Sequence, residues 1–315
     1  MMPDSPIRAL GSSGLEIASL VLGGNVFGWT AERDAGFAVL DAFVDGGGTM
    51  IDTADVYSAW VPGHQGGESE SMIGEWLRTS GKRDQVLIAT KVGMLPGGLA
   101  PDSVAAAVEG SLQRLGTDRI DLYFAHKDDD AVPLADVLGA FARLVEAGKV
   151  RAIGASNYGA MRLKEAHDVA KAEGLPHYSV LQPEYNLVSR RKFEGELQDY
   201  CVQWNIGVIP YYGLASGFLT GKYRSASDFG KSSRGGGMQK YLDGSGPAVL
   251  AAMDDVVGET AATHAQVALA WLAAQPGVTA PIASATSVAQ VQDLLGAMRL
   301  QLSGDQLARL DAAAG

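Results

Sequence analysis

The stretch Met50-Ile51-Asp52-Thr53-Ala54-Asp55-Val56-Tyr57 contains the pattern on which the fold depends. An apolar pair runs into a carboxylate, and a tyrosine follows five positions later. This pattern is typical of a buried strand that carries Asp52 at its C-terminal end, with Tyr57 on the loop that follows. In a protein built of βα repeats, catalytic residues gather at that end of the sheet. Taken alone, an aspartate at a strand end is more often a turn former or a helix cap.

Strand-like and helix-like stretches alternate eight times along the chain. The predicted strands are short, near-continuous apolar runs at residues 19–23, 50–52, 86–91, 120–126, 150–156, 180–185, 207–211 and 279–283. The predicted helices repeat apolar residues at a spacing near 3.6 and cover residues 33–46, 69–79, 101–115, 134–147, 159–173, 194–204, 261–275 and 287–296. Apolar strands that alternate with helices indicate a parallel sheet covered by helices. Eight units of this size favour a closed (β/α)8 barrel, a TIM barrel, over an open sheet.

Three features lie outside this alternation of strands and helices. Short apolar runs at residues 7–10 and 15–17 flank a Gly-Ser-Ser-Gly turn and predict an N-terminal β-hairpin. Residues 225–246, after the seventh strand, are rich in Gly and Ser and predict a mobile loop at the barrel mouth, with a functionless disordered insertion as the alternative. Residues 303–314 predict an added C-terminal helix. Because no linker divides the chain, we expect residues 1–315 to form one α/β domain.

Composition excludes several classes of protein. A net charge of −11 argues against nucleic-acid binding, which needs clustered Lys and Arg. No apolar run is long enough to span a membrane, and the first residues lack the pattern of a signal peptide. The single cysteine, Cys201, cannot form an internal disulfide and is interpreted as core packing. We expect a cytoplasmic protein that is a monomer or a weak homo-oligomer.

Chemically versatile side chains close three neighbouring predicted strands. The second strand ends in Asp52, the third in Lys91 and the fourth in His126, while Tyr57 follows the second. A lysine that closes a buried run must be paired or desolvated, and Asp52 is its natural partner. Taken singly, Lys91 could be a solvated strand terminus and His126 a satisfied core histidine. The histidines show no zinc-site spacing, so we expect no metal.

Several longer motifs occur in a fixed order: residues 8–15, 52–57, 67–70, 89–93, 121–126, 148–157, 182–186 and 214–223. Through them the chain resembles the aldo-keto reductases over essentially its whole length, and in particular the bacterial reductases related to potassium-channel β subunits. The resemblance implies reduction of aldehydes or ketones with NADPH, and a catalytic tetrad of Asp52, Tyr57, Lys91 and His126.

Physical chemistry supports these roles. A hydride that reaches a carbonyl carbon leaves negative charge on the oxygen, so a proton donor must stand there, and Tyr57 would be that general acid. We expect the Lys91 ammonium to lower the pKa of the phenol and Asp52 to hold Lys91 in place. His126 can donate a hydrogen bond to the developing oxyanion.

The resemblance also implies an extended NADP(H) across the barrel mouth, and no Gly-x-Gly-x-x-Gly indicates a Rossmann domain. Ser156, Asn157 and Gln182 would hold the carboxamide, and Tyr211 would stack on the nicotinamide. The full predicted set is Gly24, Asn25, Ser156, Asn157, Gln182, Tyr211, Leu214, Ser216, Gly217, Leu219, Lys222, Ser284, Thr286 and Gln290. Thr286 stands where many relatives place an Arg or Lys, which predicts only a modest preference for NADPH over NADH.

The predicted substrate pocket is lined by Phe27, Val56, Trp60, Met94 and Tyr212, which suggests a small-molecule carbonyl compound with an apolar or aromatic body. A sugar is the alternative, since sugars also stack on tryptophan. Two other functions are weighed against carbonyl reduction. One is a cofactor-binding, redox-sensing or regulatory subunit with slow turnover; the other is a barrel hydrolase with paired carboxylates, which would have no use for Lys91 and Tyr57.

Overall fold

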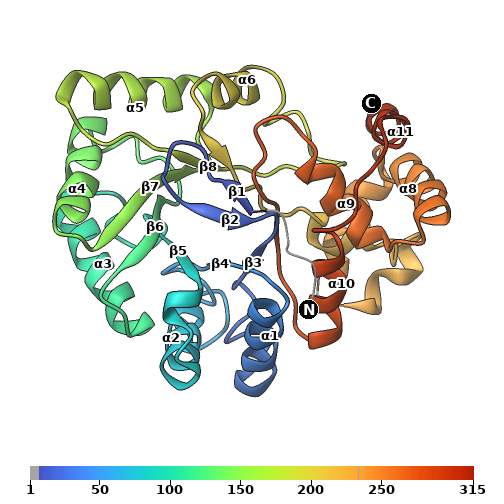
Figure 1. Cartoon of the computed structure of the whole chain (residues 1–315), viewed down its shortest axis with the longest axis horizontal. Coiled ribbons are helices and arrows are strands. Elements are labelled where there is room, and N and C mark those ends of the chain that lie inside the picture. Colours follow the sequence, from blue (N-terminus) through green and yellow to red (C-terminus); the bar gives the residue numbers. More distant parts are fainter. Residues whose placement is uncertain (1–6, 233) are drawn as a thin grey trace.

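Eight parallel strands form the centre of the computed structural model, which describes residues 7–232 and 234–315 (Figure 1). They are β3 (Val21–Gly23), β4 (Met50–Asp52), β5 (Leu87–Val92), β6 (Ile120–Ala125), β7 (Val150–Ser156), β8 (Val180–Gln182), β9 (Gly207–Val208) and β10 (Ile282–Ala283). The strand order is β10-β3-β4-β5-β6-β7-β8-β9. The amide of Ile282 donates to the Pro210 carbonyl at 2.9 Å, and Val208 bridges Val278, so the two edges of the sheet also meet. The predicted (β/α)8 fold is confirmed.

Several strands are shorter than predicted, and prolines account for much of the difference. The predicted strand 180–185 ends at Gln182, directly before Pro183, and the predicted strand 207–211 ends at Val208, two residues before Pro210. The predicted strand 279–283 contributes only the two residues that follow Pro281. Proline has no N–H to donate to a sheet. An isolated bridge between Glu184 and Tyr211 continues the pairing beyond the gap.

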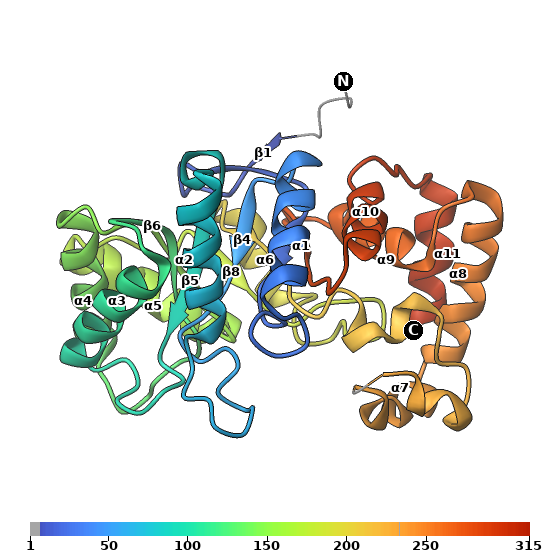
Figure 2. The same cartoon turned by 90° about the horizontal axis from the view of Figure 1, so that it is seen from below.

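The antiparallel pair β1 (Ile7–Ala9) and β2 (Glu16–Ala18) forms the predicted N-terminal hairpin. Its buried side chains Leu10, Leu15 and Ile17 pack with the side chains that fill the barrel interior. Gly11 makes this approach possible: it has φ 55°, and a Cβ there would lie 2.1 Å from the amide nitrogen of Gly207. In Figure 2 the hairpin and α7 (Gln239–Leu242) lie at opposite sides of the molecule. The hairpin therefore closes one end of the barrel and leaves the other end for chemistry.

Helices surround the sheet (Figure 1). They are α1 (Arg33–Asp45), α2 (Glu68–Ser80), α3 (Pro101–Leu115), α4 (Leu134–Glu146), α5 (Ala160–Glu173), α6 (Glu196–Gln203), α9 (His264–Ala273) and α10 (Val288–Gly296), with the short 3-10 helix η1 (Arg83–Gln85) before β5. Buried residues repeat along them at helical spacing, as in Val137, Leu138, Phe141 and Leu144 of α4. The predicted helix 261–275 begins later, at His264, because the Thr263 side chain caps it by accepting from the Gln266 amide.

The C-terminal third differs most from the prediction. The described residues 225–232 and 234–246 do lie at the barrel mouth, but they contain η3 (Ala226–Lys231), η4 (Gly235–Gly237) and α7, where a loop without helices was expected. A further helix, α8 (Gly246–Thr260), was not predicted. The predicted C-terminal helix is present as α11 (Gly304–Ala314), capped by Ser303, and packs against α8.

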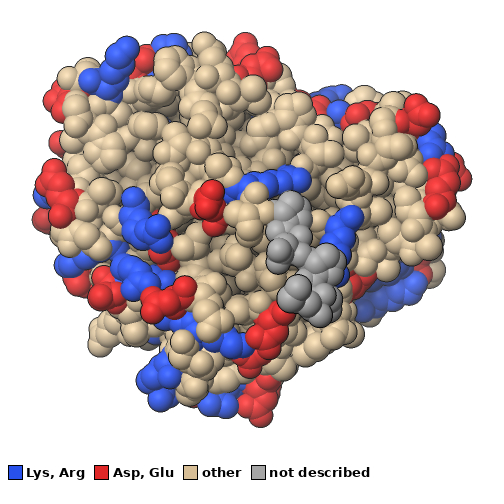
Figure 3. All heavy atoms as spheres, viewed as in Figure 1, with Lys and Arg blue, Asp and Glu red and all other residues tan. Residues whose placement is uncertain are grey.

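Charges of both signs are mixed on one face of the molecule. In Figure 3 basic and acidic side chains are interspersed, and no basic patch dominates that face. Among residues 7–232 and 234–315, no helix combines the length and apolar character that a membrane crossing requires.

Candidate active site

The ammonium of Lys91 is the centre of the site. Its Nζ donates to Asp52 Oδ2 at 2.6 Å, to the Thr53 carbonyl at 2.7 Å and to the Tyr57 hydroxyl at 2.9 Å. These contacts use all three N–H groups of the ammonium. Lys91 is 0% exposed and Asp52 is 1% exposed, so the ion pair is buried. The predicted partnership of Asp52, Lys91 and Tyr57 is therefore present in atomic contact.

The alternation of side chains along β5 explains the position of Lys91. Ala89 contributes to the barrel interior, and Lys91, two residues on, points the same way. Thr90 points outward and donates to Glu70 Oε1 at 2.6 Å. A turn then holds the tyrosine, because the Tyr57 amide donates to the Ala54 carbonyl and the Asp55 amide donates to the Lys91 carbonyl.

Burial dominates the electrostatics of the site. It raises the pKa of the Tyr57 phenol well above its ordinary value, and the Asp52 carboxylate adds to this effect. Burial also lowers the pKa of Lys91, against the pull of Asp52. The net pKa of the phenol is raised all the same, because burial and Asp52 outweigh the contact with Lys91, which favours the phenolate. Tyr57 therefore keeps its proton at neutral pH, as a proton donor must.

His126 follows β6 and faces Tyr57, with the two ring centroids 6.0 Å apart. Burial, then the charges of Lys91 and Lys127, lower the pKa of His126 well below its ordinary value. The imidazole is therefore neutral at pH 7 and donates through one N–H. Because the Asn157 amide donates to the His126 carbonyl at 2.9 Å, the loop after β7 supports this position.

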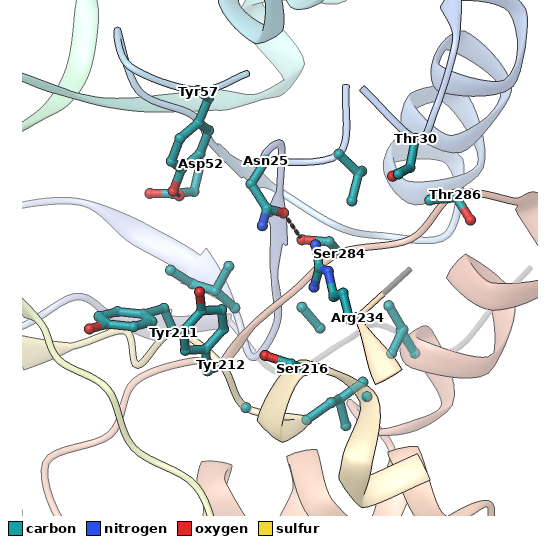
Figure 4. A pocket seen from close by; sticks show the side chains of 18 of the residues that line it. Asn25, Thr30, Asp52, Tyr57, Tyr211, Tyr212, Ser216, Arg234, Ser284 and Thr286 are labelled. Atoms are coloured by element: carbon teal, nitrogen blue, oxygen red, sulfur yellow. Dashed lines mark hydrogen bonds between the residues drawn. The ribbon is translucent and has the colours of Figure 1, made fainter. Parts of the chain in front are cut away.

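A cavity of about 850 Å³ opens above these residues (Figure 4). That size is within the range of small-molecule and cofactor sites. Most residues of the predicted cofactor and substrate sets line it, namely Asn25, Val56, Trp60, Met94, Ser156, Asn157, Gln182, Tyr211, Tyr212, Leu214, Ser216, Gly217, Lys222, Ser284, Thr286 and Gln290. Asp52, Tyr57 and His126 also line it, whereas Lys91 lies beneath Tyr57 and Asp52.

Three predicted site residues do not line the cavity. Phe27 is 0% exposed and packs in the core outside the barrel, so it cannot touch a substrate. Leu219, in η2 (Ala215–Thr220), is buried in the same core. Gly24 has a supporting role, because its amide donates to the Asp52 carbonyl at 2.7 Å and a Cβ would lie 2.9 Å from that oxygen. We therefore remove these three from the contact sets.

The amide side chains of the predicted carboxamide site already form a network. Gln182 Nε2 donates to Asp52 Oδ1 at 2.8 Å, and the Tyr211 hydroxyl donates to Asn157 Oδ1 at 2.7 Å. Ser156 donates to the Gln182 carbonyl at 2.9 Å. Asn157 has φ 62° and Tyr212 has φ 57°, conformations that cost energy outside glycine and tend to cluster at functional sites.

Two cations of the cavity wall were missed by the sequence reasoning. Arg234 lines the cavity, with its guanidinium carbon 5.5 Å from the Trp29 ring centroid (Figure 4). Lys127 directly follows His126. A basic residue within the Gly-rich run at 234–237 was a signal for Arg234, since such loops commonly bind phosphates. Lys127 carried no signal of its own, because a lysine in a loop is usually solvated.

Other candidate chemistry finds no support in the described residues. Across 7–232 and 234–315, no group of three or more His, Cys, Asp or Glu side chains is arranged to hold a metal ion. Burial raises the pKa of the Cys201 thiol to about 12, which leaves it unreactive at neutral pH.

Comparison with known proteins identifies relatives of the whole chain. Residues 19–314 match the model of the Aldo/keto reductase family. The uncharacterized oxidoreductase YrpG of Bacillus subtilis (strain 168) is 32% identical, over 96% of this chain and 94% of YrpG. The aldo-keto reductase yakc of Schizosaccharomyces pombe, named with NADP(+), is 30% identical over 87% of this chain and 80% of its own. A probable voltage-gated potassium channel subunit beta of Oryza sativa subsp. japonica is 30% identical over 92% and 90%. The resemblance predicted from the motifs is confirmed.

Proposed function

This chain belongs to the aldo/keto reductase family, and we propose on that basis that it reduces aldehydes or ketones to alcohols with NADPH, with Tyr57 as the proton donor. The observation that carries the proposal is the buried contact of Lys91 with both Asp52 and the Tyr57 hydroxyl. A hydrolase has no use for a phenol held by an ammonium in this way.

Each side chain of the site has its own role in the proposed carbonyl reduction. The hydride would be supplied by NADPH when it is bound. Tyr57 donates its hydroxyl proton to the carbonyl oxygen, and the neutral His126 donates an N–H hydrogen bond to the same oxygen. Lys91 then stabilises the phenolate at 2.9 Å, which favours the proton transfer. Asp52 and the Thr53 carbonyl fix the direction of the ammonium, and Gln182 fixes Asp52.

The cavity suits a dinucleotide that carries phosphates. Lys222 and Arg234 line it, and neither side chain forms an ion pair with another of the described residues. Unpaired cations next to a cavity favour an anionic ligand. Thr286 is a weaker phosphate ligand than expected, because its amide and its hydroxyl both donate to Gln290 Oε1. We therefore assign recognition of the 2′-phosphate to Arg234 and revise the expected NADPH preference upward.

Quenching of tryptophan fluorescence tests this assignment without any turnover. NADPH and NADH are titrated into the wild-type protein, into Arg234→Gln and into Arg143→Gln, whose arginine lies exposed on α4. We expect Arg234→Gln to weaken NADPH binding about tenfold more than NADH binding, because a charge-assisted hydrogen bond is lost, and Arg143→Gln to leave the ratio unchanged. Equal weakening of both cofactors would mean that Arg234 does not recognise the 2′-phosphate.

A panel of aldehydes and ketones, with NADPH consumption as the readout, tests the reaction itself. The alternative, a regulatory subunit with slow turnover, predicts one burst of cofactor oxidation and little thereafter. Continued turnover with at least one carbonyl class supports the enzyme, and a single burst with every compound would support the regulatory subunit.

A further inference from the structure

Lys127 is an exposed cation at the substrate side of the cavity. It directly follows His126 and lines the same cavity as Tyr57. Its charge contributes, after burial and Lys91, to the lowered pKa of His126. The mechanism proposed above gives this ammonium no role.

Asp128 and Asp129, the two carboxylates that directly follow Lys127, are occupied elsewhere. Asp128 accepts from Arg162 Nε at 2.9 and 3.0 Å. Asp129 accepts from the Leu99 amide at 2.9 Å and from the Ala131 amide at 3.3 Å. Throughout the described part of the chain, the Lys127 ammonium forms neither an ion pair nor a hydrogen bond. It is thus an unneutralised positive charge in a protein whose net charge is −11.

The barrel separates Lys127 from Ser284 and Thr286, two residues of the predicted cofactor site. Lys127 follows β6, whereas Ser284 and Thr286 follow β10, four places away in the strand order. In a barrel of eight strands, positions four apart lie on opposite sides. The part of the cavity lined by Ser284 and Thr286 is therefore across the mouth from Lys127.

Exposed aromatic and apolar side chains also line the cavity. Trp60 is 48% exposed, Tyr212 46% and Met94 41%, which are high values for such residues and leave their surfaces available to a ligand. Trp60 packs edge-on against both Trp29 and Tyr57, so its ring is held beside the proton donor. A flat aromatic ring fits between such surfaces.

We propose that Lys127 is a specificity-determining residue that binds a carboxylate or phosphate group carried by an aromatic aldehyde or ketone. The carbonyl would lie at Tyr57 and His126, the ring against Trp60, and the anionic group at the Lys127 ammonium. This inference rests on the proposed carbonyl reduction and names its substrate class.

A matched pair of substrates tests the inference. 4-Carboxybenzaldehyde and methyl 4-formylbenzoate have nearly the same size and ring electronics, but only the first carries a charge. We expect the wild-type ratio of kcat/KM, acid over ester, to fall about tenfold in Lys127→Gln and further in Lys127→Glu. In Lys171→Gln, whose lysine lies exposed on α5, the ratio should stay at the wild-type value. Added salt should lower the wild-type ratio and have little effect on that of Lys127→Gln.

Measurements of binding and of turnover together distinguish a failure of this inference from a failure of the proposed function. Quenching of tryptophan fluorescence by each compound gives its affinity even without turnover. If the acid binds more tightly than the ester and Lys127→Gln removes the difference, the inference stands even where no aldehyde is reduced, and only the proposed function fails. If aldehydes are reduced but the ratio is the same in wild type and Lys127→Gln, the inference is overturned and the function stands.

Discussion

Replacing Lys91 by Met tests the buried charge pair at the centre of the site. Methionine fills a similar volume but leaves Asp52, which is 1% exposed, without its ammonium. The remaining donors to that carboxylate are Gln182 at 2.8 Å and Tyr57 at 3.3 Å. Loss of one partner of a buried pair costs about 3–5 kcal/mol, and we expect that loss of unfolding free energy in urea at pH 7. The double variant Asp52→Asn with Lys91→Met should lose less than Lys91→Met alone, because no unpaired charge remains.

The same variant tests the link between Lys91 and the phenol. Alcohol oxidation needs the phenolate, which the ammonium stabilises at 2.9 Å. In Lys91→Met the pKa of Tyr57 should rise further, so oxidation should begin at a higher pH than in the wild type. The pH–rate profile of alcohol oxidation with NADP+ measures this shift. An unchanged profile, together with a stability within about 1 kcal/mol of wild type, would refute the coupling of Asp52, Lys91 and Tyr57.

Two further predictions concern groups outside the tetrad. Burial, with the charge of Glu70, raises the pKa of Asp55 to about 7 from 3.8, so its buried carboxylate destabilises the folded state increasingly as pH rises from about 4 to 7. Asp55→Asn should therefore gain stability relative to wild type over that range, by up to about 4 kcal/mol, which urea titrations at several pH values would measure. The exposed control Asp118→Asn should show no such trend. Cys201, whose pKa is raised to about 12 by burial, should resist iodoacetamide at pH 8 in the native protein and react once the protein unfolds, as mass spectrometry would show; rapid native alkylation would contradict its burial.

The barrel and the grouping of three strand-end residues could be predicted because both depend on local periodicity, whereas the tetrad was implied by the family resemblance. Apolar runs define strands, and the residue that closes a parallel strand lies at one end of the sheet, so Asp52, Lys91 and His126 could be placed together. The additional helix α8 could have been found in the same way, since Val249, Leu250, Met253 and Val256 repeat at helical spacing. It lies outside the alternation of strands and helices from which the other helices were predicted.

Contacts between distant loops could not be predicted in this way. The approach of Arg234 to Trp29 joins segments about two hundred residues apart, and the hydrogen bond from Gln182 to Asp52 joins segments separated by 130 positions. No periodic pattern encodes either contact. Phe27 was predicted to line the substrate pocket, because an aromatic residue in a loop after a strand suggests a ligand contact. The chain instead turns its side chain into the core. The sign of the Tyr57 pKa shift depended on how deeply the phenol is buried, which only the packed structure shows.

The central claim is that Tyr57 donates the proton, and Tyr57→Phe tests it most directly. The variant keeps the ring that packs against Trp60 and His126 and removes only the hydroxyl. We predict that kcat for carbonyl reduction falls by about 10²–10⁴-fold while the NADPH affinity, measured by fluorescence quenching, stays near wild type. A variant that retains more than about a tenth of wild-type kcat would contradict the account.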